Sequence, residues 1–127
     1  MGKAVPQMGR RHAMTMVTCE WNFQLTDVGD VQELPTHAEG LMKELLTLEE
    51  CNEQLTDSAV GLDMETVTIQ VAVTAECDTF EQAVAEAMSA IRTAIHANGG
   101  TTADWPQDLP TKDDAIEYEP RGMQALV

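Results

Sequence analysis

The 127-residue chain lacks the features that mark membrane and secreted proteins. It contains no uninterrupted apolar run of about 18 residues, which is the length a membrane-spanning helix needs. Residues 1–13 lack the apolar centre of a secretory signal peptide. We therefore expect a soluble, cytoplasmic protein with no membrane partner.

Cysteine is also scarce, and the three cysteines stand singly at Cys19, Cys51 and Cys77. An odd count without a Cys-x-x-Cys pair does not form a disulfide framework. The chain therefore fits a reducing compartment.

Short catalytic and ligand-binding motifs are missing as well. There is no Gly-rich phosphate loop and no nucleophile elbow, and the pair Gly99-Gly100 is better explained as a helix stop. The histidines His12, His37 and His96 stand at no metal-ligand spacing from one another or from a cysteine. The sequence predicts no metal site, no cofactor and no catalytic residues.

Positive charge is rare: 7 Lys and Arg against 22 Asp and Glu give a formal net charge of −15. All the acidic residues follow Met16, whereas Lys3, Arg10 and Arg11 make the first residues basic. The negative electrostatic potential of such a body repels the phosphates of nucleic acids, so we expect no direct nucleic-acid binding by the acidic body. A solvated acidic surface is the simpler interpretation. A nucleic-acid mimic would need regularly spaced surface carboxylates, a pattern that this sequence does not show.

What the chain does contain is two strands with strict alternation. From Thr15 to Leu25, one side carries the apolar residues Val17, Cys19, Trp21, Phe23 and Leu25. A second run starts at Thr66, with its apolar residues also two apart, and the weaker segment from Thr56 to Met64 precedes it. A period of two indicates a strand with one buried face. We expect the last two segments to form a hairpin.

Two amphipathic helices separate these strands. The sequence Thr36-His37-Ala38-Glu39 resembles a capping box and predicts a helix from there to about Cys51. A second helix is expected to open at Asp78 and to stop at Asn98-Gly99-Gly100.

This element order resembles the ferredoxin-like arrangement, in strand and helix order only. It predicts an α+β, two-layer β-α-β-β-α sandwich with a possible short fourth edge strand at 101–105. We expect one domain over residues 14–103, a basic and flexible arm at 1–13, interpreted as an upstream extension, and an acidic, Pro-containing tail at 104–127. Whether this tail packs on its own subunit or on a neighbour stays open.

The helices should cover one face of the sheet and leave the other open. That open face is the candidate interface. Trp105 is interpreted as a clamp over the end of the core, or as an anchor on a neighbouring subunit. The expected members of the interface are Thr18, Glu20, Asn22, Thr66, Thr68, Gln70 and Trp105. Solvent exposure and a subunit contact are equally compatible with such a polar face.

Three classes of function follow, in decreasing order. The first is a non-catalytic interaction or assembly protein, a homo-oligomer or an accessory subunit of a larger bacterial or phage complex, because no catalytic constellation is visible. The second is a regulatory domain that binds a small molecule at a dimer interface, by analogy of fold. The third is a dimeric ferredoxin-like enzyme that uses His37 or Glu20 as acid or base.

Overall fold

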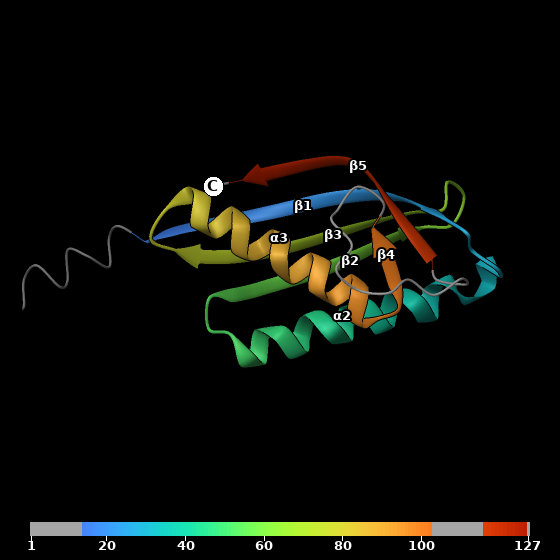
Figure 1. Ribbon diagram of the computed structural model, residues 1–127, viewed down its shortest axis with the longest axis horizontal. Helices are drawn as coiled ribbons and strands as arrows, with labels where there is room; N and C mark the ends of the chain where they lie inside the picture. Colours follow the sequence, from blue (N-terminus) through green and yellow to red (C-terminus); the bar gives the residue numbers. More distant parts are fainter. Residues whose placement is uncertain (1–13, 103–115, 127) are drawn as a thin grey trace, which may run out of the picture.

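The computed structural model describes residues 14–102 and 116–126. The expected arm at 1–13, and Trp105 with the rest of 103–115, lie outside the described residues. Within them the chain forms a mixed sheet with two long helices (Figure 1). The strands are β1 (Thr15–Thr26), β2 (Leu55–Asp63), β3 (Thr68–Cys77), β4 (Gly100–Thr102) and β5 (Ile116–Leu126).

Strand β1 lies at the centre of the sheet, whose order is β2-β3-β1-β5-β4. It pairs antiparallel with β3 on one side and with β5 on the other, so that Phe23 stands opposite Ile69 and Pro120. The short β4 runs parallel to the start of β5. The predicted alternation of β1 is confirmed, because all five of its expected inward residues are buried.

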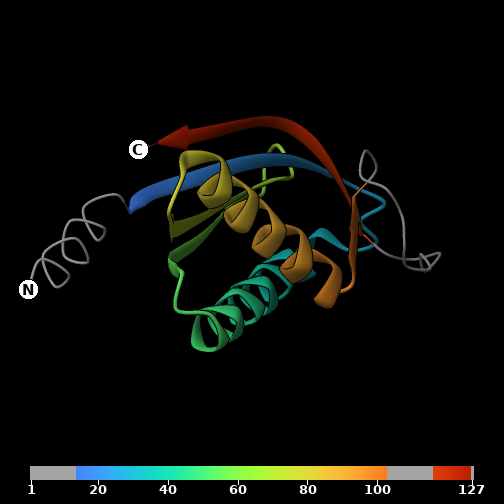
Figure 2. The same ribbon diagram turned by 60° about the vertical axis from the view of Figure 1, so that its left-hand side comes forward.

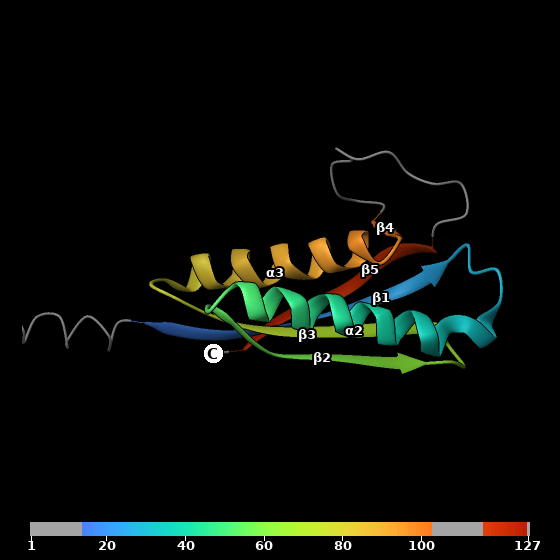
Figure 3. The same cartoon turned by 90° about the horizontal axis from the view of Figure 1, so that it is seen from below.

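The helices α2 (Leu34–Cys51) and α3 (Phe80–Ala97) lie on the same side of the sheet (Figure 2). Helix α2 packs on β2, whereas α3 packs on β3 and β1. Figure 3 shows the two helices side by side along the strands. Their inward stripes consist of small and aliphatic side chains such as Leu41, Leu45, Ala87 and Ile91. Close packing of these stripes onto the sheet forms the hydrophobic core.

The helix starts differ from the prediction. A short 3-10 turn, η1 (Val31–Glu33), leads into α2, and the Asp30 side chain caps η1 by accepting a hydrogen bond from the Gln32 amide. Thr36 therefore lies inside α2, and no capping box forms. Helix α3 is capped by the hydroxyl of Thr79 rather than by Asp78. A hydroxyl or carboxylate one or two residues away can cap equally well, so sequence locates a cap only approximately.

The predicted fold class is wrong. A ferredoxin-like β-α-β-β-α sandwich with a short fourth edge strand and an acidic tail does not describe this sheet of five strands, in which the 11-residue β5 pairs with β1. The composition of residues 116–126 did not indicate β5, because this segment contains several charged residues together with Pro120 and Gly122. They are tolerated because β4 covers only Ile116–Tyr118, which leaves the outer edge of β5 from Glu119 onward without a neighbouring strand among the described residues.

Candidate functional site: a pocket beside His37

Tyr118 of β5 points inward and is fully buried, with 0% of its surface exposed. Its ring meets Phe23 of β1 edge to face, with a centroid separation of 5.3 Å. Gly100 at the start of β4 makes this position possible, because a Cβ atom there would come within 2.5 Å of the tyrosine ring. The tyrosine thereby joins β5 to the core.

The hydroxyl of Tyr118 contacts a histidine from α2. The Nε2 atom of His37 lies 2.5 Å from this hydroxyl, within hydrogen-bonding distance. His37 sits in the first turn of α2 and is partly exposed. The pair therefore links the last strand of the sheet to the first helix.

Asn98, the residue that follows α3, completes the cluster. Its Nδ2 atom donates to the backbone carbonyl of His37 at 2.9 Å and lies 3.4 Å from His37 Nδ1. Gly40 permits this approach, because a Cβ atom there would collide with the side-chain oxygen of Asn98. Three segments distant in sequence thus converge on one imidazole ring.

The hydrogen bonds assign the tautomer of His37. Nδ1 faces an amide donor, so in the neutral ring it carries the lone pair and Nε2 carries the proton. The Nε2–H group then donates to the Tyr118 oxygen. Both ring nitrogens are therefore engaged within the protein.

Burial sets the charge of this pair. Desolvation lowers the pKa of His37 below its usual value and strongly raises the pKa of the Tyr118 hydroxyl. Both side chains are consequently neutral near pH 7. They form a hydrogen-bonded support and not a charged acid–base couple.

A pocket of about 750 Å³ opens beside this cluster, at the junction of the η1 turn, the start of α2 and the end of α3. His37 and Asn98 are among its lining residues, and the buried Tyr118, which contacts His37, is not. Apolar wall comes from Val28, Leu34 and Ile116. The remaining lining residues are Gly29, Asp30, Glu33, Thr36 and Gly40.

A pH dependence follows from the lowered pKa of His37. Between that pKa and the ordinary value of 6.5, the unfolded chain binds more protons than the folded chain. The free energy of unfolding that neutral His37 contributes is therefore fully present above pH 6.5 and is lost as the pH falls through the pKa of His37 in the folded chain. We expect the His37 ring signals to titrate below 6.5 in an NMR experiment.

Denaturant unfolding across the same pH range checks the consequence. His37→Gln should flatten part of the acid-side loss of stability. Burial and the nearby Arg92 also lower the pKa of His96, so His96→Gln is the matched variant that removes only the second contribution. A His37 that titrated at or above the ordinary value would contradict the buried, neutral assignment.

The residues predicted for an interface occupy a different surface. Thr18, Glu20 and Asn22 of β1 lie on the sheet face away from the helices, with Thr74, Ala72 and Gln70 opposite them. Thr18 and Thr74 join their hydroxyls across the strands at 2.6 Å. Thr68 also lies on this face, opposite Gln24. Thr66 does not belong to β3 as expected but to the turn before it, and Trp105 lies outside the described residues.

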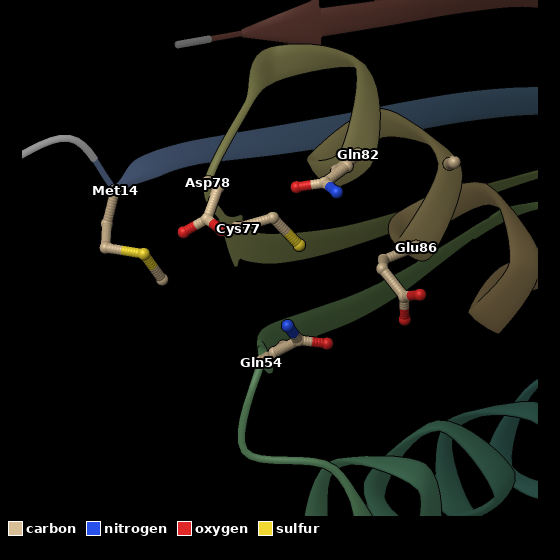
Figure 4. A pocket seen from close by; sticks show the side chains of 7 residues that line it. Met14, Gln54, Cys77, Asp78, Gln82 and Glu86 are labelled. Carbon is tan, nitrogen blue, oxygen red and sulfur yellow. The ribbon is translucent and has the colours of Figure 1, made fainter. Parts of the chain in front are cut away.

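A second, smaller pocket of about 280 Å³ lies where β3 passes into α3 (Figure 4). Cys77, Gln82 and Glu86 are among its lining residues. Desolvation first, and then the carboxylates nearby, raise the pKa of the Cys77 thiol. Since the thiolate is the reactive form, this cysteine is not activated as a nucleophile.

Across residues 14–102 and 116–126, no group of three or more His, Cys, Asp and Glu side chains is placed to hold a metal ion. Among the same residues, no helix has the length and hydropathy needed to cross a membrane.

Sequence reasoning did not bring Tyr118 and Asn98 to His37. Tyr118 is the single tyrosine of the chain and stands in a segment that composition assigns to a tail. Its sequence context identifies Asn98 as a helix stop, a role that it also fills as the C-cap of α3. The Ile116 and Tyr118 alternation was the available signal, but only the pairing of β5 with β1 brings that alternation to His37.

Comparison of the chain with protein-family models, with curated proteins and with solved structures finds no match.

Proposed function

We propose that this protein binds a small molecule in the pocket beside His37 and does not transform it chemically. The observation that carries the proposal is the cluster at the pocket wall, in which Tyr118 and Asn98 hold His37 in one orientation. Preorganised polar groups next to an apolar wall are typical of ligand sites, and a volume of about 750 Å³ lies within their usual range.

Binding is favoured over catalysis by the state of the imidazole. A general base needs an unoccupied ring nitrogen near the substrate, but both nitrogens of His37 face protein partners. Glu20, the other residue considered for acid–base chemistry, lies on the opposite face of the sheet. The pocket therefore offers hydrogen bonds and apolar contact rather than a proton-transfer pair.

The proposal can be tested with a substitution that fills the pocket and leaves the fold undisturbed. A Cβ atom at Gly29 meets nothing within 4 Å, so Gly29→Trp places a large ring at the pocket wall. Fragments of mixed charge are screened by amide NMR shifts, and we expect hits that move the signals of His37 and Asn98. Gly29→Trp should weaken these hits by at least about tenfold, because the ring occupies the ligand volume.

Gly122→Trp is the matched control, since Gly122 is equally unobstructed but lies opposite Asn22 on the other face of the sheet. It should leave fragment binding unchanged. If no fragment moved the His37 and Asn98 signals, or if both tryptophan variants weakened binding alike, the proposal would be rejected.

Assembly through the open sheet face is the second candidate function. The observation that favours it is two large apolar side chains at one end of that face, where Met16 is 52% and Leu126 is 44% exposed. The polar ladder of β1 and β3 adjoins them. A second copy of the chain or a partner protein would cover the two apolar side chains and the polar residues of β1 and β3.

This second candidate predicts a discrete dimer or larger closed oligomer by light scattering, at low and at high salt. Gln70→Arg, on the open face, should shift the mass towards the monomer through repulsion and lost packing. Thr93→Arg, exposed on α3, adds the same charge elsewhere and should not. A wild-type monomer under both conditions would argue against self-assembly.

A further inference from the structure

Among the described residues, the carboxylates are the charged side chains that line the His37 pocket. They belong to Asp30 and Glu33, and none of the described lining residues is Lys or Arg. We propose that the ligand is a small organic amine whose ammonium group lies by these carboxylates and whose apolar part rests on Val28, Leu34 and Ile116. This inference rests on the proposed ligand-binding function.

The carboxylates are placed to receive a cation. One oxygen of Asp30 accepts the Gln32 amide, and this contact orients the carboxylate, whereas none of the described residues donates a hydrogen bond to its second oxygen. Glu33 is the last residue of η1, directly before α2, and is exposed. Glu33 is the N-cap residue of α2, so one carboxylate belongs to the positive end of this helix and reduces the attraction of that end for an anion.

The C-terminal end of α3 also favours a positively charged ligand. Asn98 follows the last turn of α3, so the pocket adjoins the end of the helix where the carbonyl groups carry partial negative charge. This end favours cations. The net charge of −15 adds a general repulsion of anionic ligands.

His37 does not oppose an ammonium group. With Nε2 donating to Tyr118 and Nδ1 facing Asn98, the ring is neutral and presents no positive charge to the pocket. The aliphatic wall opposite suits a hydrocarbon or aromatic frame. An amine with such a frame matches both halves of the pocket.

Three probes with similar frames and different charges test this inference by amide NMR titration: phenethylammonium, phenethyl alcohol and 3-phenylpropionate. We expect all measurable binding to move the His37 and Asn98 signals. Phenethylammonium should bind about fivefold more tightly than the alcohol at low salt, because exposed ion pairs contribute modestly, and 3-phenylpropionate should bind least. High salt should reduce the preference.

Asp30→Asn with Glu33→Gln should abolish this preference, and the Asn side chain retains an oxygen for the Gln32 amide. Glu50→Gln with Glu53→Gln removes the same charge at the far end of α2 and should keep the preference.

Equal or tighter binding of the alcohol or the carboxylate at His37 and Asn98 would overturn the amine assignment and leave the ligand-binding function standing. Failure of all three probes would also reject the amine assignment, and the mixed-charge fragment screen would then decide the function separately.

Discussion

Tyr118→Ala is expected to lower the free energy of unfolding by about 4 kcal/mol, the range measured for large aromatic truncations in cores. The ring is fully buried and packs on Phe23, so its removal leaves a cavity between β5 and the helices. It also leaves His37 without its hydrogen-bond partner. Denaturant unfolding monitored by circular dichroism measures the change.

Two variants separate the causes. Tyr118→Phe keeps the ring and removes the hydroxyl, so it should cost only about 1–2 kcal/mol, the usual cost of leaving a buried donor unpaired. Met123→Ala truncates an exposed residue of the same strand and should stay within about 0.5 kcal/mol. If Tyr118→Ala behaved like Met123→Ala, β5 would be a dispensable tail, as composition suggests.

Gly100→Ala should be the second most damaging substitution, at about 2 kcal/mol, because overpacking a buried site costs roughly 1–3 kcal/mol. The new Cβ atom would lie 2.5 Å from Cε1 of Tyr118 and 2.9 Å from Cγ2 of Ile95. Both neighbours are fully buried and cannot move aside easily. Thermal or denaturant unfolding gives the value.

Gly122→Ala provides the control, since a Cβ atom there meets nothing within 4 Å and its effect should be near zero. A double-mutant cycle identifies the clash: in a Tyr118→Ala background, Gly100→Ala should cost clearly less, because the closer of its two clashes is gone and only the contact with Ile95 is left. Equal costs of Gly100→Ala with and without the Tyr118 ring would refute this packing explanation.

Prediction from the sequence succeeded for features that the residue pattern of a single strand or helix determines. Alternation in β1 identifies its buried face, and the stripe on α3 identifies the side that meets the sheet. Prediction failed for contacts between residues of different elements that are distant in sequence. Asn98 has a sufficient local role as the residue after α3, and nothing near it in sequence indicates the carbonyl of His37 that it contacts.

The turn before β3 illustrates the limit at the level of single residues. Val67 continues the apolar alternation of β3, so the sequence predicts that Thr66 belongs to the strand. In the structure Val67 has a φ of +55° and the Asp63 carboxylate accepts the amides of Glu65 and Thr66, which keeps these residues in the turn. Side chain to backbone hydrogen bonds of this kind compete with the sheet ladder and shorten a strand by a residue or two.

By itself, the sequence determined the acidic charge, the two amphipathic helices and the buried faces of β1 and β3, because periodicity and composition are local properties. Only the tertiary structure decided that residues 116–126 form a strand beside β1 and that Tyr118, His37 and Asn98 meet at one pocket. The reason is that β5 is weak as an isolated segment, and the backbone hydrogen bonds to β1 and the burial of Tyr118 that stabilise it come from residues remote in sequence.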